Sequence, residues 1–356
     1  MPKFAIPNAA MVLVLLGAAC STDGASTGST PSEPTTSVVA VQLTTSTTTP
    51  PEVTEVTEVT VNIELAPLTG RETQVERAAL VIKIDNHDRA RPQFGLNQAD
   101  VVFEEIVEGG ITRLAAVFHS EDADPVGPVR SARTGDFDLL TNLDRPLFAN
   151  SGGNQRVLAL LRDVDMVDVG VNAAPDQYWR LQERSAPHNL LTTTEGLFSA
   201  DSGRAGQPSA LFSYRTPDDA LPASAEITMG VSIDFGENAV SYEWNAVSEG
   251  WARTQNGELH VDADDWLVAP ANVVVQFVNY GRSAASSASP EAQLVGDGAV
   301  WVFTSGRFIK GTWSRSAPEE VTLFVDIDGD EILLTPGRTW VELPRVGQAA
   351  LLVDDS

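Results

Sequence analysis

The sequence predicts an α+β fold: an N-terminal α/β domain with a mixed sheet, followed by a mostly antiparallel, all-β C-terminal domain. Over residues 65–221, short apolar runs rich in β-branched residues alternate with helix-like segments. Such alternation is typical of layers with a mixed or parallel sheet. Over residues 222–348 helical periodicity almost disappears, and Asn256-Gly257 and Asp328-Gly329 separate strand-like runs. These dipeptides favour β-hairpins. Residues 349–356 are expected to form a tail.

Apolar runs mark the expected strands of the first domain, at residues 79–84, 101–106, 112–118, 147–149 and 166–171. Helices are expected over residues 137–143 and after Ser151-Gly152-Gly153-Asn154. In such sheets, ligands bind at the C-terminal ends of the strands. The polar turn Asp85-Asn86-His87-Asp88 follows the first strand and lies at such an end. In the second domain, strands are expected at residues 227–235, 241–245, 273–280, 299–303, 321–325, 332–334 and 340–343.

The N-terminus has the pattern of a secretory signal peptide over residues 1–19. Lys3 precedes an apolar run at residues 9–16, and small residues precede Cys20. Gly17-Ala18-Ala19-Cys20 resembles a bacterial lipobox, which predicts that Cys20 is lipidated; the alternative is a plain signal peptide with an incidental cysteine. Cys20 is the single cysteine of the chain, so an intrachain disulfide and a cysteine-based zinc site are excluded.

Residues 20–64 are rich in Ser and Thr and too poor in apolar residues to form a core. We expect a disordered spacer that carries the lipid anchor. The anchor and the spacer predict an extracytoplasmic protein held on the outer face of the cell membrane.

The charge of the chain excludes some classes of function. Its formal net charge is −26, and a hydrophobic fraction of 42% is sufficient for large cores. A general nucleic-acid binder needs a basic face, so we expect no nucleic-acid partner. The sequence also lacks a Gly-x-Ser-x-Gly elbow, a His-Glu-x-x-His helix and the glycine-rich phosphate loops of nucleotide-binding enzymes.

Three arginines lie within or beside the apolar strands of this acidic chain: Arg113, Arg130 and Arg133. A guanidinium is rarely buried without an anionic partner. That partner is either an internal carboxylate, such as Glu104 or Glu105, or the phosphate or carboxylate of a ligand. The sequence leaves both alternatives open.

Two further segments are candidates for contacts with an anion. Ser151, Gly152 and Gly153 precede an expected helix, and helix N-termini present free N–H groups to anions. The alternative for this motif is a tight turn and a helix cap. His188 and Asn189 lie in a polar loop, where His188 can contact an anion or donate a proton, or simply bond to the backbone.

Four blocks, in order, resemble the YerB-like family of bacterial lipoproteins, which is built on paired domains of unknown function. The blocks are Asp85-Asn86 with Ala90-Arg91-Pro92-Gln93 and Gly95-Leu96; residues 99–104 with Glu108-Gly109-Gly110-Ile111-Thr112-Arg113; Gly127-Pro128-Val129-Arg130-Ser131-Ala132-Arg133; and Ala186-Pro187-His188-Asn189. The resemblance covers about residues 65–344. It implies an anchored extracytoplasmic protein and supplies no established activity.

A more distant resemblance is to the LytR-CpsA-Psr family, whose members transfer wall glycopolymers from polyprenyl-pyrophosphate carriers. It implies that Asp100 ligates Mg²⁺ and that Arg130 contacts pyrophosphate. Asp85, at a strand end, is the second candidate metal ligand. The chain departs from that pattern because Ser131 follows Arg130 where the family has an acidic residue.

Three hypotheses for function follow. The first is a lipoprotein that binds an anionic cell-wall or lipid-linked ligand in an arginine-lined cleft of the first domain. The second is a Mg²⁺-assisted phosphotransferase. The third is a structural or protein-interaction lipoprotein without a small-molecule site. We expect the first; protein partners and the identity of the ligand are not predicted.

Overall fold

The computed structural model describes residues 64–353, which belong to one compact unit, Thr60–Ser356. The predicted signal peptide, the lipidation site Cys20 and the spacer up to residue 63 lie outside the described residues. No helix within residues 64–353 is long and apolar enough to cross a membrane.

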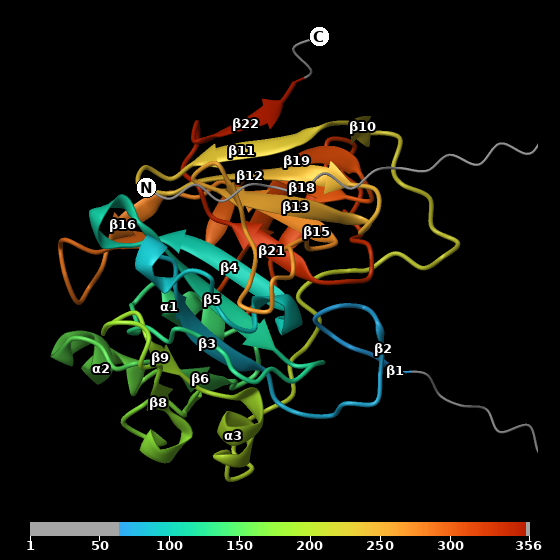
Figure 1. Ribbon diagram of the computed structural model, residues 1–356. Helices are drawn as coiled ribbons and strands as arrows, with labels where there is room; N and C mark the ends of the chain where they lie inside the picture. Colours follow the sequence, from blue (N-terminus) through green and yellow to red (C-terminus); the bar gives the residue numbers. More distant parts are fainter. Residues whose placement is uncertain (1–63, 354–356) are drawn as a thin grey trace, which may run out of the picture. The chain divides into compact units, whose positions relative to one another are not determined.

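The largest element is an eleven-stranded mixed sheet (Figure 1). Most neighbouring strands are antiparallel, whereas β15–β21, β21–β4, β3–β6 and β6–β7 are parallel. A mixed sheet is therefore present, but it is not confined to the first domain, where it was expected. In spatial order its strands are β10 (Glu226–Ile227), β19 (Arg307–Arg315), β18 (Gly296–Thr304), β15 (Asn272–Gln276), β21 (Thr339–Glu342), β4 (Val101–Ile106), β5 (Thr112–Phe118), β3 (Leu80–Asp85), β6 (Leu147–Ala149) and β7 (Val167–Asp168), with β20 (Leu323–Asp326) paired to β19.

This sheet contains strands from both sequence segments, the first at residues 65–221 and the second at residues 222–348. β21 from the second segment pairs with β4 from the first, in a parallel register from Thr339↔Val101 to Glu342↔Glu104. The boundary expected between residues 221 and 222 therefore does not separate two sheets. Residues of both segments meet in the centre of one hydrogen-bonded layer.

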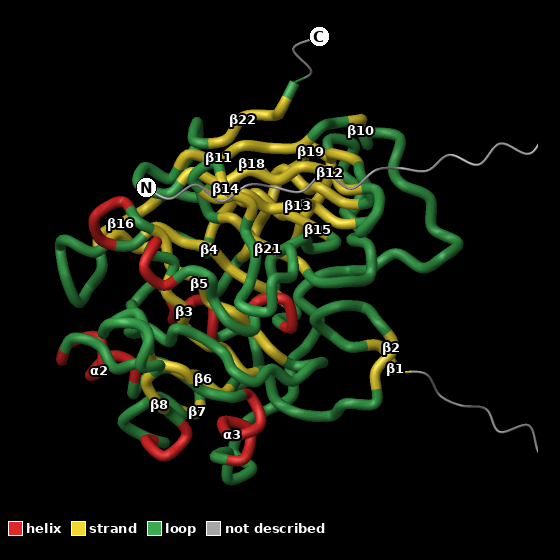
Figure 2. The backbone as a smooth tube through the Cα atoms, viewed as in Figure 1, coloured by secondary structure: helices red, strands yellow, loops and turns green. Residues whose placement is uncertain are grey.

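A second, five-stranded antiparallel sheet covers one face of the large sheet (Figure 2). Val231, Tyr242 and Trp251 from this sheet share one apolar core with Val102 and Trp340 from the large sheet. The antiparallel sheet expected in the second segment is thus present. Its strands are β14 (Glu258–Leu259), β13 (Gly250–Gln255), β12 (Ala239–Asn245), β11 (Gly230–Asp234) and β22 (Ala349–Leu352).

Two expectations near the C-terminus need correction. Ala349–Leu352 were expected in a tail but form β22 and pair with β11, because Ala349 and Leu351 pack against the core between the sheets. The strand expected at residues 332–334 is not formed; Leu334 makes an isolated bridge to Tyr214.

The helices are short and lie against the edge of the large sheet that the first segment forms (Figure 1). Leu139 and Leu161, from α1 and α2, share a second core with Phe103 of β4 and Phe148 of β6. The helices are α1 (Asp136–Leu140), α2 (Gln155–Leu161) and α3 (Thr194–Ser199), with single turns η1 (Asp88–Ala90), η2 (Leu96–Gln98), η3 (Glu108–Gly110) and η4 (Pro175–Gln177). Three small two-stranded sheets, with strands of two or three residues, complete the described elements. They are β1 (Glu64–Leu65) with β2 (Glu72–Thr73), β8 (Trp179–Arg180) with β9 (Leu190–Leu191), and β16 (Tyr280–Arg282) with β17 (Pro290–Ala292).

The central strands β3, β4 and β5 are buried along their whole length. Their β-branched residues suit a sheet that is covered on both faces. The charged residues among them must be paired, since an isolated buried charge is strongly unfavourable. These are Lys83, Asp85, Glu104, Glu105 and Arg113.

Candidate anion-binding site

Asp85 is the last residue of β3, and the sheet register sets it opposite Arg113 near the start of β5. The segment leading to Arg130 runs beside the same end of β3. Its hydrogen bonds are Asp85 N–H to the Pro128 carbonyl at 2.9 Å and Arg130 N–H to the Lys83 carbonyl at 2.8 Å. Backbone pairing thus brings Arg113 and Arg130 to one buried carboxylate.

The Asp85 carboxylate is shared by three basic side chains. Arg113 Nη1 lies 2.5 Å from Oδ1, whereas His188 Nδ1 and Arg130 Nε lie 2.7 Å and 3.2 Å from Oδ2. The Asp85 side chain is fully buried, whereas 18% of the Arg130 side chain and 12% of the His188 side chain are exposed. The cluster therefore begins in the interior and opens at the surface.

His188 is held by the loop that contains it. The Asn189 amide donates to the carbonyls of Leu181 and Arg184 at 3.0 and 2.8 Å and accepts from Arg180 at 2.8 Å. Asn189 is buried by these contacts. Its side chain therefore holds the loop that contains His188 and is largely inaccessible to solvent.

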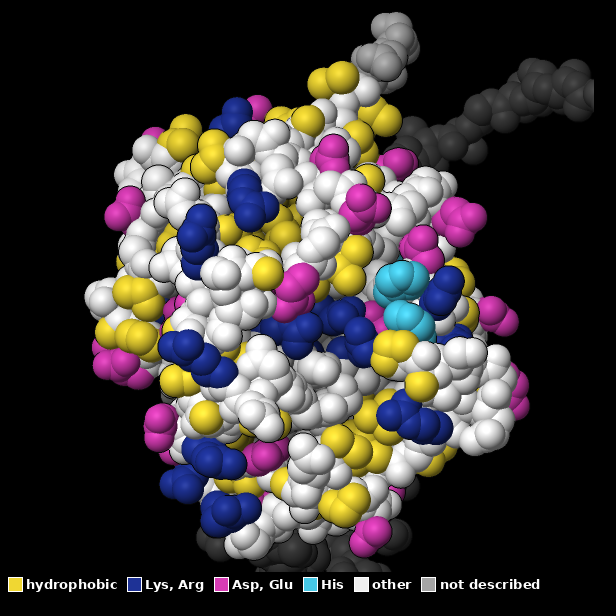
Figure 3. Space-filling view, turned by 90° about the vertical axis from the view of Figure 1, so that its left-hand side faces the viewer, with side chains coloured by type: hydrophobic (Ala, Val, Ile, Leu, Met, Phe, Trp, Pro, Cys, Tyr) yellow, Lys and Arg dark blue, Asp and Glu magenta, His cyan; other side chains and the backbone are white. Residues whose placement is uncertain are grey.

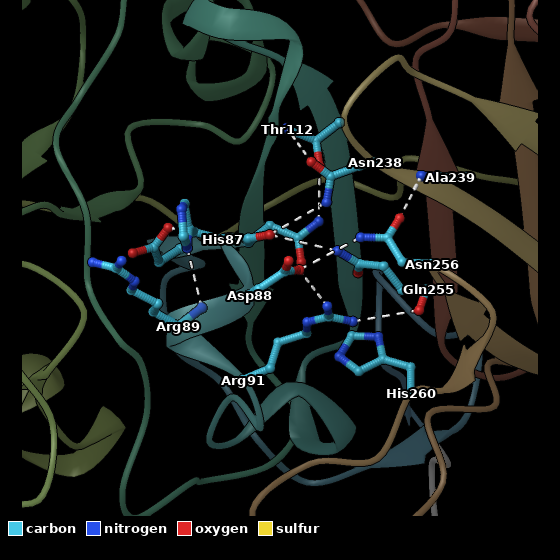
Figure 4. A network of polar contacts seen from close by, with 12 residues as sticks. His87, Asp88, Arg89, Arg91, Thr112, Asn238, Ala239, Gln255, Asn256 and His260 are labelled. Atoms are coloured by element: carbon cyan, nitrogen blue, oxygen red, sulfur yellow. Dashed lines mark hydrogen bonds and ion pairs between the residues drawn. The ribbon is translucent and has the colours of Figure 1, made fainter.

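The His188 ring also packs on His87, with 4.7 Å between the ring centroids. Figure 4 shows how the turn after β3 is fixed: Arg91 donates to the Gln255 carbonyl at 3.4 Å and ion-pairs with Asp88. His87 accepts from the Arg89 N–H through Nδ1, at 3.0 Å. In the sequence, His87 belongs to the polar turn that follows the first strand, and this position at a strand end is the signal that identifies it as a neighbour of the site.

Arg133 forms the adjoining part of the cluster and is paired with Glu108. Its Nε lies 2.9 and 3.1 Å from the two carboxylate oxygens, and both side chains are partly exposed. Hydrogen bonds from Ser289 and Arg133 hold the pKa of Glu108 below its ordinary value, although burial alone would raise it. Glu108 is therefore ionised at neutral pH. We use the term cationic cleft for Asp85, Arg113, Arg130, Arg133 and His188.

Basic groups outnumber carboxylates in the cationic cleft. With Glu108 included, three guanidinium groups and one imidazole face two carboxylates. Burial lowers the pKa of Arg113 to about 10; Asp85 opposes this shift, and the positive charges of Arg130 and Arg133 add to it. Figure 3 shows Lys and Arg side chains gathered in a hollow of this face, with two His side chains beside them.

The guanidinium of Arg130 is incompletely used. Its Nε has no hydrogen-bond partner, and its terminal nitrogens donate to no side chain or carbonyl within residues 64–353. A guanidinium has five donors and can engage a phosphate or carboxylate in bidentate geometry. Arg130 therefore has free donor capacity at the surface of the cluster.

The glycine-rich motif is placed beside the cluster, but its N–H groups are largely engaged internally. Ser151 N–H donates to the Arg130 carbonyl, and Gly152 N–H donates to the Asn150 side chain, both at 2.9 Å. The Asn154 side chain caps the first turn of α2. These contacts fit the alternative of a tight turn and cap, in which Ser151 contacts the backbone of Arg130 and the side chain of Ser131.

The two metal-ligand candidates lie apart. Asp85 is at the Arg113 end of β5, whereas the Asp100 N–H bonds to Val117 near the other end. Asp100 Oδ2 accepts the N–H groups of His119 and Ser120 at 2.5 and 2.9 Å. Within residues 64–353, no group of three or more His, Cys, Asp or Glu side chains is arranged to hold a metal ion. The arrangement gives no support to a shared Mg²⁺ site.

Two other buried networks contrast with the cationic cleft. Lys83 Nζ lies 2.5 Å from Glu105 and 2.6 Å from Asp136, so two carboxylates face one ammonium. Arg253 lies 2.6 Å from Glu104, and both side chains are fully buried. Although burial opposes it, the charge of Glu104 raises the pKa of Arg253. In both networks the carboxylates match or outnumber the basic groups.

Comparisons with known proteins show what this chain is similar to. Two domains described as the N-terminal and C-terminal domains of a protein of unknown function (DUF3048) match residues 67–206 and 231–341. A Bacillus subtilis protein named "Putative lipoprotein YerB" is 28% identical over 291 residues, which cover 78% of this chain and 85% of that protein. The crystal structure of Bacillus subtilis YerB matches with a TM-score of 0.72 and 26% identity, over 82% of this chain and all of the other.

Proposed function

Because this chain belongs to the YerB-like family of paired DUF3048 domains, we propose that it is a lipid-anchored extracytoplasmic protein that binds an anionic group in the cationic cleft. The signal pattern of residues 1–19 and the lipobox-like position of Cys20 support the anchor. The family relationship to a protein named as a lipoprotein supports it independently.

The observation that carries the proposal is the excess of basic groups around Asp85. One buried carboxylate is shared by Arg113, Arg130 and His188. A partly desolvated positive charge without a full counter-charge is unfavourable in the free protein. An incoming anion would supply the missing negative charge and accept hydrogen bonds from the unused donors of Arg130.

The chemistry of the cleft favours phosphate, pyrophosphate or carboxylate as the bound group. Guanidinium groups match the oxygen spacing of these anions, and charge-assisted hydrogen bonds are stronger than neutral ones. A Mg²⁺-assisted transfer is less well supported, because three basic groups already lie within 3.2 Å of the Asp85 oxygens. A cation bound there would be repelled by the same arginines.

Calorimetric titration with pyrophosphate tests the proposal. The protein without its first 20 residues keeps the whole compact unit Thr60–Ser356. We expect saturable binding, weakened in Arg130→Ala by at least about tenfold, since a hydrogen bond to a charged group contributes roughly 1.5–3 kcal/mol. The matched control is Arg145→Ala, which removes an equal charge from an exposed pair with Asp165. Equal binding by Arg130→Ala and the unaltered protein would contradict the proposal.

A further inference from the structure

A second group of arginines borders a hollow next to the cationic cleft. The hollow has a volume of about 330 Å³ and lies against the η3 turn, which joins β4 to β5. Arg282 of β16 and Arg345 contribute to its wall, together with Ser287 and Ser289. Both arginines are exposed, and neither has a carboxylate within ion-pair distance among residues 64–353. In a chain of net charge −26, two adjacent unpaired arginines stand out.

Arg345 is held in place before any ligand arrives. Its guanidinium carbon lies 4.5 Å from the centre of the Tyr280 ring. The Tyr280 hydroxyl donates to the Leu343 carbonyl at 2.7 Å and accepts from Ile106 N–H of β4 at 3.0 Å. The Tyr280 ring that contacts Arg345 is therefore fixed to β4 of the large sheet. A pre-positioned guanidinium loses less conformational freedom on binding than a free one.

A short chain of contacts joins the hollow to the cationic cleft. Ser289 of the hollow donates to Glu108 Oε1 at 2.5 Å, and Glu108 in turn accepts from Arg133 at 2.9 Å. Figure 3 shows basic side chains gathered in a central hollow of one face, with an acidic side chain and further basic side chains nearby. The two basic groups are thus consecutive parts of one surface.

We propose that the ligand of the cationic cleft is a linear polyanion with repeated phosphate groups, which continues past Glu108 into the hollow of Arg282 and Arg345. This inference rests on the proposed function, since the cleft must itself bind an anion. Repeated phosphates fit better than a single group because both sets of arginines border the η3 turn: Arg133 pairs with Glu108, and Gly109 and Gly110 line the hollow of the other two. Phosphate fits better than carboxylate because each group offers more acceptor oxygens to clustered guanidinium and hydroxyl donors.

Glu108 lies between the two sets of arginines and carries a negative charge where the polymer would pass. It holds Arg133 as a ligand phosphate would hold it, so the two compete for the same guanidinium. Removing its charge in Glu108→Gln is expected to strengthen binding of the polymer several-fold. A glutamine of the same size can still accept from Ser289.

The test compares inorganic pyrophosphate with long-chain inorganic polyphosphate in the same calorimetric titration. For the unaltered protein we expect polyphosphate to bind at least tenfold more tightly per chain than pyrophosphate. In Arg282→Ala/Arg345→Ala, the affinity for polyphosphate should fall by at least tenfold, and that for pyrophosphate should change less than twofold. Arg145→Ala/Arg204→Ala is the matched control, because it removes two charges near the Leu80 end of β3, opposite the Asp85 end. Arg145 lies there because it precedes β6, which pairs with β3 from Leu80. Arg204 lies near Arg145 because the Arg145 carbonyl accepts from Gly206 N–H.

The outcomes separate the two proposals. If pyrophosphate binds but the Arg282/Arg345 variant keeps full affinity for polyphosphate, the extended site is wrong and the cationic cleft stands. If the control variant loses as much affinity as the test variant, binding reflects total charge and the extended site is equally wrong. If poly-glutamate binds as tightly as polyphosphate, the preference for phosphate is wrong. If the folded, unaltered protein binds no pyrophosphate, the proposed function fails as well.

Discussion

Two arginine clusters in this molecule differ in how completely their guanidinium groups are paired. In the first, every nitrogen of Arg253 is engaged: Nη2 with Glu104, Nε with the Tyr242 hydroxyl at 3.0 Å, and Nη1 with Gln255 and His260 at 2.8 and 2.6 Å. In the second, Arg130 shares one carboxylate with Arg113 and His188 and keeps unused donors at the surface.

The difference teaches how to separate structural arginines from binding arginines. Arg253 of the five-stranded sheet reaches Glu104 of the large sheet, so its pair ties the two layers together across the core. Its guanidinium is paired with Glu104, and both side chains are fully buried. The cationic cleft has an incomplete counter-charge and an opening to solvent. Charge balance combined with exposure, rather than the presence of an ion pair, distinguishes the proposed binding site from the buried Arg253 cluster.

The largest effect is expected from breaking the sealed network, by which we mean Arg253, Glu104, Tyr242 and Glu342. Arg253→Leu leaves the Glu104 carboxylate buried without its partner. Removing one member of a buried pair costs about 3–5 kcal/mol of unfolding free energy. Urea denaturation measures this change. Arg133→Leu, in which a partly exposed ion pair is removed, is the matched control and should cost about 1 kcal/mol or less. A loss as small in Arg253→Leu as in the control would remove the distinction between the clusters.

A smaller effect, visible as a pH dependence, is expected at Glu342. Its carboxyl accepts from the Tyr242 hydroxyl, and burial, together with the charge of Glu104, raises its pKa well above the ordinary value of 4.5. The folded state therefore holds this proton more tightly than the unfolded state. Its contribution to stability is complete below pH 4.5 and falls as pH rises, by up to about 1.4 kcal/mol per pH unit, until the carboxyl ionises in the folded protein.

Glu342→Gln removes that titration while keeping the hydrogen-bonding shape. As pH is raised above 4.5, the unfolding free energy of the variant should increase relative to that of the unaltered protein. Denaturation curves collected across neutral and acid pH measure the difference. Parallel stability profiles for the two proteins would show that Glu342 is ionised in the fold, and the sealed network would then not be charge-balanced.

The sequence was informative where a signal is local. Strands β4, β5 and β6 have the predicted bounds because their apolar, β-branched runs are continuous. Strand β13, Gly-Trp-Ala-Arg-Thr-Gln, was missed because its polar residues hide the pattern, and with it the role of Arg253.

Partners that lie far apart in the sequence could not be predicted. His188 lies 103 residues from Asp85, and Arg253 lies 149 residues from Glu104. The sequence therefore left open whether the arginines face a ligand or internal carboxylates. In the structure Arg113, Arg130 and Arg133 have internal carboxylate partners that do not balance their charge, and the anionic ligand that would complete the balance is our proposal.

The most direct test of this account is the unfolding free energy of Arg130→Ala without any ligand. If Arg130 is an excess charge kept for binding, its removal relieves repulsion with Arg113 and should leave the unfolding free energy unchanged or slightly higher. If Arg130 is instead a structural partner of Asp85, the variant should lose about 3–5 kcal/mol, as expected for Arg253→Leu. That second result would contradict the assignment of the cationic cleft as a binding site.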